Sequence, residues 1–325
     1  AGCDNPAMEW ILMTLASLLA GFVDAIVGGG GLVMVPALFA AFPGAPPATL
    51  LGTNKAASVL RMRGVPATTI HRILYTPLYD PQYEKIAEWL TGVGDRPVIE
   101  DTTGSVLEID APVRAEDAAV VPVSVRTKQL PGGAYVSKVH LVIDENPSPI
   151  GGTFTFTPLA GRADIETRVR IEAYSWVRAI AETSDGKVYV ARRFVKASGG
   201  CSAPAGKDME EALARLGKMK FKVEEGSVGQ PSVAQLMISH PNSSGLAMDQ
   251  MTRLFVPPHF VRRVEVTFGG EPVMTADVDF SISENPNFRF YVLPAKEGEL
   301  KAVVVDSKDL RFESSVAIKP GLRGS

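Results

Sequence analysis

Val264-Glu265-Val266-Thr267-Phe268 and Ala276-Asp277-Val278-Asp279-Phe280 alternate apolar with polar or charged residues. Successive side chains of a strand point to opposite faces, so this period of two indicates strands with one buried face. Six short runs rich in β-branched residues lie in this part of the chain: Val233 to Ser239, Phe260 to Phe268, Val273 to Phe280, Arg289 to Leu293, Leu300 to Asp306 and Phe312 to Ile318. Together they predict an antiparallel β-sandwich of about 90 residues.

The preceding stretch has the same texture, with short runs divided by Asn-Pro, Pro-Gly-Gly and Asp-Gly. Ser184-Asp185-Gly186-Lys187 is a hairpin signal between two of these runs. The expected elements are a short helix at Tyr83 to Trp89 and strands at Val106 to Ile109, Val120 to Thr127, Val136 to Asp144, Thr153 to Thr157, Arg168 to Ile180 and Val188 to Lys196. We therefore expect a mainly β protein with two immunoglobulin-like antiparallel sandwiches, for which packing face to face is one arrangement.

Composition excludes several classes of protein. The 325 residues include 33 Lys and Arg against 36 Asp and Glu, a balance that argues against an electrostatic nucleic-acid binder. Two cysteines exclude a disulfide framework and a Cys-rich zinc module. The four histidines form no His-Glu-x-x-His or His-x-His pattern, and no Gly-x-Ser-x-Gly elbow is present. We expect no metal and no cofactor.

The N-terminal region differs from the rest of the chain. Residues Trp10 to Phe42 contain 24 apolar residues in 33, and Asp24 is their only charge. A helix over Trp10 to Val27 reaches the lower length limit for spanning a membrane. The region resembles the start of the TauE/SafE family of membrane anion exporters through Ala20 to Leu32, Val35 to Leu38 and Leu51 to Ala57. The likeness ends near residue 59, and a segment of this length is too short to form a transport path.

A glycine-rich loop, Ser198-Gly199-Gly200-Cys201-Ser202-Ala203-Pro204-Ala205-Gly206, interrupts the pattern of strands. Glycine lets the backbone adopt many conformations, which favours a mobile thiol that can enter the active site of another protein. The thiolate is the nucleophile, and Lys196 and Lys207 are the nearest cations in sequence that could lower the pKa of Cys201. The alternatives are an incidental loop cysteine and a buried one.

Each of the two β-rich blocks contains its own set of further motifs, in a characteristic order along the block. In the first block they are Ala111 to Val123, Asp144 to Pro149, Thr167-Arg168-Val169-Arg170, Ser184-Asp185-Gly186 and Gly199-Gly200-Cys201; in the second they are His240-Pro241, Ile282-Ser283-Glu284-Asn285-Pro286 and Phe288 with Phe290. The first set resembles SoxY, the sulfur-carrying subunit of bacterial thiosulfate oxidation, and the second resembles its partner SoxZ. Their fusion most resembles the quinoprotein dehydrogenase-associated SoxYZ-like carriers.

The resemblance implies a periplasmic carrier that is not itself an enzyme. Inorganic sulfur intermediates would be held on Cys201 as a thiosulfonate or persulfide, on an arm made flexible by Gly199, Gly200 and Ser202. Partner enzymes of the Sox type, or of a quinoprotein dehydrogenase system, would act on them, and the SoxY-like and SoxZ-like halves would pack together. SoxY ends in a free Gly-Gly-Cys-Gly-Gly tail, whereas here the chain continues for 124 residues beyond Cys201. The arm is therefore a loop anchored at both ends, and its reach is shorter.

These observations divide the chain into five expected parts. They are a hydrophobic TauE/SafE-like segment (1–60), a linker (61–82), a SoxY-like sandwich with the cysteine arm (83–206), a helix and linker (207–230), and a SoxZ-like sandwich (231–325). Residues 10–42 are a candidate membrane anchor, and Cys3 a candidate for lipidation. A non-catalytic periplasmic module of two sandwiches that binds another protein is the main alternative function, and part of a membrane anion exporter is a weaker one.

Overall fold

A computed structural model of the chain describes residues 96–203, 209–224, 229–249 and 254–319. The chain divides into two compact units, Ala1–Ile86 and Ala87–Ser325, and the described residues all belong to the second. The hydrophobic segment, the 61–82 linker and the expected helix at Tyr83 to Trp89 lie outside the described residues. Among the helices that are described, none combines the length and the apolar character that a membrane span requires.

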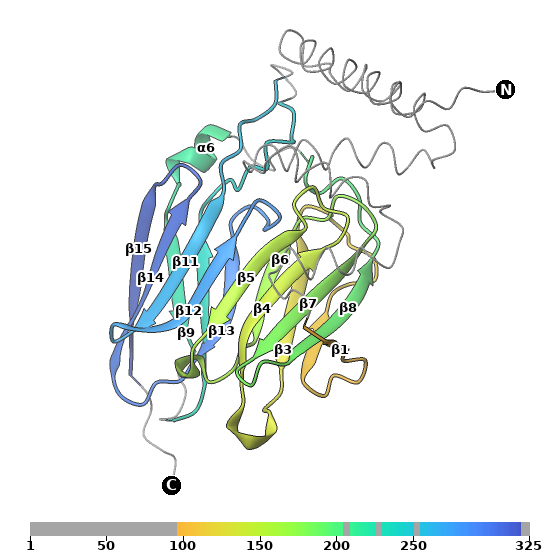
Figure 1. The fold of residues 1–325 in the computed structure, drawn as a ribbon. Helices are drawn as coiled ribbons and strands as arrows, with labels where there is room; N and C mark the ends of the chain where they lie inside the picture. The colour runs from red at the N-terminus through yellow and green to blue at the C-terminus, as the bar shows by residue number, and fades with distance from the viewer. Residues whose placement is uncertain (1–95, 204–208, 225–228, 250–253, 320–325) are drawn as a thin grey trace, which may run out of the picture. The chain divides into compact units, whose positions relative to one another are not determined.

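The described residues form two sheets, which confirms the expected mainly β fold (Figure 1). The larger sheet has nine strands, in the order β1 (Val98–Glu100), β8 (Val188–Val195), β7 (Ser175–Thr183), β4 (Val136–Ile143), β5 (Ile150–Phe156), β12 (Glu271–Val278), β11 (Val261–Phe268), β14 (Gly298–Asp306) and β15 (Arg311–Ile318). The smaller sheet has six strands, in the order β2 (Leu107–Asp110), β3 (Val121–Thr127), β6 (Ile165–Val169), β13 (Asn287–Val292), β10 (Ser232–Ile238) and β9 (Met219–Val223). Two 3-10 turns, η1 (Pro131–Gly133) and η2 (Pro158–Ala160), and one helix, α6 (Met209–Ala214), complete the described elements.

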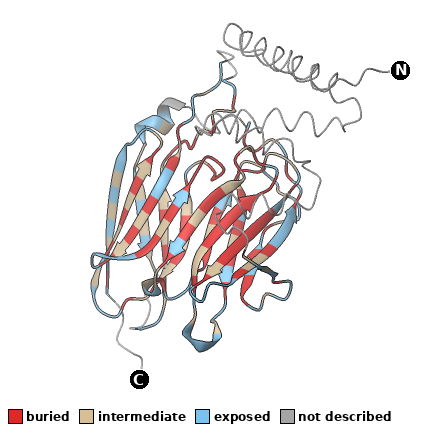
Figure 2. Ribbon diagram, viewed as in Figure 1, coloured by how far each residue is buried: buried red, intermediate tan, exposed pale blue. Residues whose placement is uncertain are grey.

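Alternation in the sequence sets the faces of these strands. In β3, Val121, Val123 and Val125 are buried, while Pro122 and Arg126 are exposed. The same alternation recurs in β10 and β13 of the same sheet and in β14 of the nine-stranded sheet. Buried residues occur along both sheets (Figure 2), and those of the two sheets form one large hydrophobic core. The apolar residues removed from water on these facing sides supply the main driving force for the fold.

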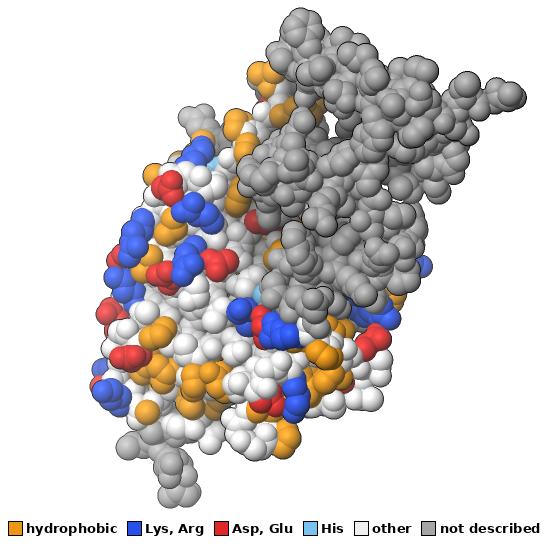
Figure 3. Space-filling model, viewed as in Figure 1, with side chains coloured by type: hydrophobic (Ala, Val, Ile, Leu, Met, Phe, Trp, Pro, Cys, Tyr) orange, Lys and Arg blue, Asp and Glu red, His pale blue; other side chains and the backbone are white. Residues whose placement is uncertain are grey.

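Side chains of both charges cover the outer surface of the second block, where Lys and Arg lie among Asp and Glu (Figure 3). Arg263 on β11 contacts Glu265 at 2.7 Å and Asp277 on β12 at 3.0 Å, and Lys301 on β14 contacts Glu313 on β15 at 2.7 Å. Such exposed pairs add little to stability. The mixture of signs agrees with the balanced composition and gives this surface no basic patch for a nucleic acid.

The two β-rich blocks join edge to edge and do not pack face to face. β5 of the first block pairs with β12 of the second over five residue pairs, from Phe156–Met274 to Gly152–Val278. β6 and β13 meet in the other sheet through Glu166 and Arg289. Both sheets are therefore continuous across the two blocks.

One expected strand is interrupted. Arg168 to Ile180 reads as a single strand in the sequence, but β6 ends at Val169 in the six-stranded sheet and β7 begins at Ser175 in the nine-stranded sheet. Residues 170–174 cross between the layers, and they carry Arg170 and Glu172. The expected linker of residues 207–230 also contains β9, which pairs with β10 at the edge of the smaller sheet.

One aromatic contact ties the two blocks through the core. Phe154 on β5 and Phe288 on β13 are fully buried, and their rings meet edge to face with centroids 6.1 Å apart. This pair spans both sheets and both blocks, so the blocks share a single core.

We predict that the described part of the chain unfolds in one transition, because its main hydrophobic core contains buried residues of both blocks. Phe154→Ala should lower the free energy of unfolding by about 3–5 kcal/mol, the usual cost of such a truncation in a packed core. Phe255→Ala, at a residue 62% exposed, is the control and should cost less than about 0.5 kcal/mol. Urea denaturation followed by circular dichroism measures both; two separate transitions, with only one shifted by Phe154→Ala, would contradict a shared core.

Candidate functional site

The glycine-rich loop leaves the nine-stranded sheet at the end of β8 and turns back on the first block. Lys196 continues the pairing briefly, donating its N–H to Val113 O and accepting from Ala115 N–H. Gly199 then adopts a φ of +81°, in the left-handed region that favours glycine. The chain reverses here and brings Cys201 against the 170–174 crossing.

The two glycines are held by backbone hydrogen bonds. Gly199 N–H donates to Glu172 O at 2.8 Å, and Gly200 N–H donates to Ile171 O at 2.9 Å. A Cβ on Gly200 would lie 2.0 Å from Ala118 O and 2.8 Å from Ile171 N. Glycine at position 200 is thus required for close approach of two backbones, in addition to any flexibility it gives.

The Glu172 side chain fastens the residues that follow the glycines. Its Oε2 accepts hydrogen bonds from Cys201 N–H at 3.0 Å and Ser202 N–H at 3.2 Å, and its Oε1 accepts from Ser202 Oγ at 3.1 Å. Hydrogen bonds to an ionised carboxylate are stronger than those between neutral groups. Glu172 therefore acts as a clamp on the loop.

The second block closes the site from the other side. Ser244 Oγ donates to Cys201 O at 2.5 Å, and Ser244 Oγ itself accepts from Leu246 N–H at 3.1 Å. Cys201 has no exposed surface. The sequence favours an open loop, whereas the structure shows Gly199, Gly200 and Cys201 docked at the junction of the two blocks, with Ser202 at its exposed margin.

Both Asn-Pro motifs hold segments near this junction. Asn146 Nδ2 donates to Arg170 O at 2.7 Å, and Asn146 Oδ1 accepts from Glu172 N–H at 2.9 Å, so it fixes the crossing on both sides of Ile171. Asn285, with a φ of +48°, donates its N–H to His240 O at 2.8 Å. The repeated motif thus ends a strand and positions a loop in each block.

Arg170 is a buried cation at the site. Its side chain is 6% exposed, and Nη2 donates to Asn242 O at 3.2 Å. Burial lowers the pKa of Arg170, and the nearby charges of Cys201, Glu284 and Asp117 oppose that shift. Of the two lysines that the sequence suggests, Lys196 is exposed, and Lys207 lies outside the described residues.

A second buried polar cluster lies in the second block, where His240, His259 and Asp306 converge with ligand-type atoms within 4.8 Å of one another. His259 Nε2 lies 2.7 Å from Asp306 Oδ2, and the two imidazole rings meet edge to face. His240 Nδ1 accepts from Asn242 N–H at 3.0 Å, so its proton sits on Nε2, the nitrogen that faces the carboxylate. His240 Nε2 is 3.5 Å from Asp306 Oδ2 and has no hydrogen-bond partner among the described residues. Metal-bound histidines normally donate from their second nitrogen, whereas His240 Nδ1 accepts, so His240 departs from the usual geometry of a metal ligand. Burial, reinforced by the charge of His259, lowers the pKa of His240 to about 4.

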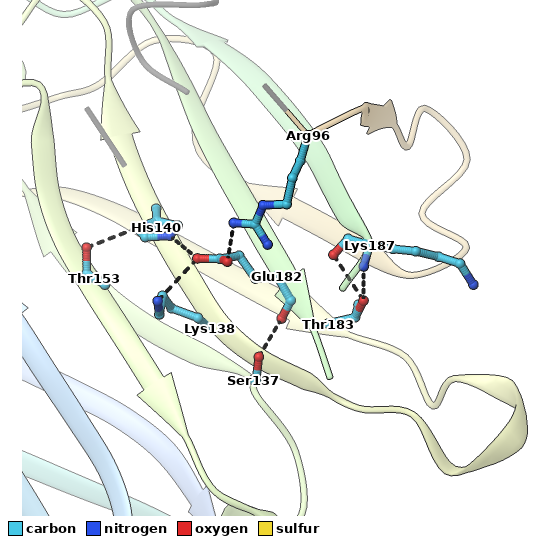
Figure 4. A network of polar contacts seen from close by, with 8 residues as sticks. All are labelled: Arg96, Ser137, Lys138, His140, Thr153, Glu182, Thr183 and Lys187. Atoms are coloured by element: carbon cyan, nitrogen blue, oxygen red, sulfur yellow. Dashed lines mark hydrogen bonds and ion pairs between the residues drawn. The ribbon is translucent and has the colours of Figure 1, made fainter. Parts of the chain in front are cut away.

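A third cluster crosses β4 and β7 (Figure 4). Glu182 accepts from Arg96, pairs with Lys138 at 3.3 Å and lies 2.8 Å from His140 Nε2. Burial raises the pKa of Glu182, but the hydrogen bonds from His140 and Arg96 and the charge of Lys138 outweigh it and bring the pKa to about 2. Neighbouring positive charges thus keep the carboxylate ionised, which is the behaviour of a structural ion network.

Comparison with known proteins identifies the two blocks. The sequence profile of "Sulfur oxidation protein SoxY" matches residues 93–201, and that of "Sulphur oxidation protein SoxZ" matches residues 219–317. The two matches together define a two-part sulfur oxidation protein, and Cys201 lies at the junction of its parts. The chain carries a SoxY domain and a SoxZ domain in tandem. Cys201 is the last residue of the SoxY match.

The N-terminal fragment matches other proteins. It is similar to "Probable membrane transporter protein YfcA" of Escherichia coli strain K12, with 51% identity over 51 residues, 16% of this chain and 18% of the relative. "Probable membrane transporter protein ORF9" of a Sinorhizobium species is 51% identical over 41 residues, 13% of this chain and 15% of the relative. The chain spans less than a fifth of the length of these relatives.

Among solved structures, superoxide reductase (neelaredoxin) from Ignicoccus hospitalis matches with a TM-score of 0.25 and 18% identity, covering 36% of this chain and 89% of that one. A β-glycosidase from Bacteroides vulgatus matches with a TM-score of 0.21 and 10% identity, covering 73% of this chain and 26% of that one. Likeness at this level carries no argument about function.

We predict that Glu172→Ala releases the loop and speeds modification of Cys201 by iodoacetamide about tenfold, because two amide hydrogen bonds to a carboxylate are lost. Gly200→Ala should act in the same direction, since its Cβ cannot fit against Ala118 O. Glu116→Ala, at an exposed residue of the same block, is the matched control and should leave the rate unchanged. The rate is measured on the Cys201 peptide by mass spectrometry; equal rates in all four proteins would contradict the clamp.

Proposed function

We propose that the chain is a covalent carrier of sulfur-oxidation intermediates, with Cys201 as the point of attachment. The observation that carries this proposal is the position of Cys201: it ends the SoxY domain, directly after Gly199-Gly200, in a loop clamped by hydrogen bonds at the border with the SoxZ domain. Hydrogen bonds of this kind exchange readily with water, so the docked loop and a released loop can interconvert.

The loading reaction is an oxidation that a partner must complete. Cys201–SH and thiosulfate give Cys201–S–S–SO₃⁻, one proton and two electrons, and the partner oxidoreductase accepts the two electrons. The new bond joins the Cys201 sulfur to the outer sulfur of thiosulfate. Hydrolysis of the terminal sulfonate by another partner enzyme would release sulfate and leave a persulfide on Cys201. The chain supplies the attachment point, and its partners supply the catalysis.

The anchored loop limits how the cargo is presented. Because the chain continues on both sides of Cys201, release of the Glu172 and Ser244 contacts would expose a short loop and no long arm. Partner enzymes of the Sox type, or of a quinoprotein dehydrogenase system, would therefore have to bring their active sites close to the junction of the two domains. We place this activity in the periplasm, with residues 10–42 as a candidate anchor; fractionation of the natural host would test both points.

One observation favours the alternative of a module that only binds another protein. Cys201 has no exposed surface, so it could be a core cysteine without chemistry. The two functions differ in whether sulfur is found on Cys201 in the cell.

We predict that chain isolated from its natural host during growth on thiosulfate carries a reducible adduct, –S–SO₃⁻ or –SH, on the Cys201 peptide. Growth without reduced sulfur should leave the peptide unmodified. Cys201→Ser should abolish the adduct, and Ser202→Ala, which keeps the thiol, is the matched control and should retain it. Peptide mass spectrometry without prior reduction makes the measurement. An unmodified Cys201 under thiosulfate growth, or an adduct that survives Cys201→Ser, would overturn the carrier proposal.

A further inference from the structure

Arg170 is a buried cation with unused hydrogen-bonding capacity. Nη2 reaches Asn242 O, but Nε is buried and has no hydrogen-bond partner among the described residues. None of the ion pairs formed by the described residues includes Arg170, on which Glu284 and Asp117 act only at longer range. A buried polar nitrogen without a partner is costly, so its retention calls for an explanation.

The position of Arg170 relative to Cys201 offers an explanation for the retention of this buried nitrogen. Ile171 and Glu172, the two residues after Arg170, bind the N–H groups of Gly200 and Cys201. On the opposite side, Arg170 is tied to Asn242 O, and Cys201 O is tied to Ser244 Oγ, two residues further along the same turn. Arg170 and Cys201 are therefore held by the same pair of segments, one from each domain.

The charges around Arg170 differ in how far they are occupied by hydrogen bonds or screened by solvent. Both oxygens of Glu172 accept hydrogen bonds from the loop. Glu284 is half-buried and Asp117 is exposed, so solvent screens their charges more than it screens a group on Cys201. When ionised, Cys201 opposes the lowering of the Arg170 pKa more than Glu284 or Asp117 does.

We propose that Arg170 is the anion-binding part of a docking site for the sulfur group carried on Cys201. This inference rests on the proposed function, and it assigns a charge to the cargo that docks: an anionic terminal group, as in Cys201–S–S–SO₃⁻ or a persulfide anion. The Nε–H of Arg170 donates to the anion, and the guanidinium charge offsets its burial. A neutral group of similar size on Cys201 gains neither interaction and docks less firmly.

The test loads Cys201 chemically, so it does not depend on any partner enzyme. Tetrathionate transfers a thiosulfonate: Cys201–S⁻ and ⁻O₃S–S–S–SO₃⁻ give Cys201–S–S–SO₃⁻ and thiosulfate, which leaves with the electron pair of the broken S–S bond. Methyl methanethiosulfonate gives the neutral Cys201–S–S–CH₃ and methanesulfinate. Each adduct is then removed with dithiothreitol, an uncharged reductant, in folded and in urea-unfolded protein. The rate of removal in unfolded protein divided by the rate in folded protein is the protection that docking provides. Both rates are measured on the Cys201 peptide.

We expect Arg170→Met to reduce the protection of the anionic adduct about tenfold and that of the neutral adduct less than about twofold. Arg170→Lys keeps the positive charge but lacks Nε. Its protection of the anionic adduct should therefore lie between that of the unchanged protein and that of Arg170→Met. Because both adducts are compared within the same variant, any general loosening of the fold lowers the protection of both and does not affect the comparison. Equal loss for both adducts would show that Arg170 only supports the structure, and unchanged protection of the anionic adduct would overturn the proposal outright.

Glu284→Gln gives an independent check in the opposite direction. It removes a negative charge that acts on Arg170 and leaves Arg170 in place. Protection of the anionic adduct should rise about twofold, while protection of the neutral adduct stays the same. A fall in anionic protection would contradict a docking site built on Arg170. If Arg170 behaves as expected but no adduct exists in the host, the carrier proposal fails and the anion site stands.

Discussion

The structure depends on the joining of strand edges between the SoxY and SoxZ domains. The pairing of β5 with β12, and of β6 with β13, makes both sheets continuous and places the two domains around one core. It also fixes the loops at the end of β6 and after β10, one from each domain, on either side of Cys201. Without this pairing, the cysteine loop would keep its hydrogen bonds to Glu172 but lose the one from Ser244, and Arg170 would lose its hydrogen bond to Asn242.

In the carrier that we propose, a docked cysteine would reconcile two demands that oppose each other. A sulfur adduct must be reachable by partner enzymes, yet a persulfide or thiosulfonate in open solvent is exposed to every thiol it meets. Hydrogen bonds to Glu172 and from Ser244 close the site without a covalent lock, so local opening can release the loop while the core stays folded. In that proposal Gly200 would serve both states, because its lack of a Cβ permits close docking and its backbone freedom would permit release.

Much of the fold could be predicted from the sequence, because the alternation in β11 and β12 and the turn residues between strands report directly on local structure. The break between β6 and β7 could not, since residues 170–174 contain no glycine or proline and continue the strand-like composition. That missed crossing carries Glu172 and Arg170, so the sequence singled out Cys201 without these two neighbours. Only tertiary contacts bring Arg170 to the site, although Arg170 is the last residue of the Thr167 to Arg170 motif in the sequence.

Amide hydrogen exchange at Gly199, Gly200 and Cys201 tests the central claim, a cysteine loop that docks and opens without unfolding of the domain. These amides should exchange more slowly than an unprotected chain, because Ile171 and Glu172 accept their hydrogen bonds. They should also exchange much faster than Ala179 in the middle of β7, and their opening free energy should be nearly independent of low urea concentrations. Exchange as slow as that of Ala179, with the same urea dependence, would mean that the loop opens only on global unfolding and would contradict a carrier at Cys201.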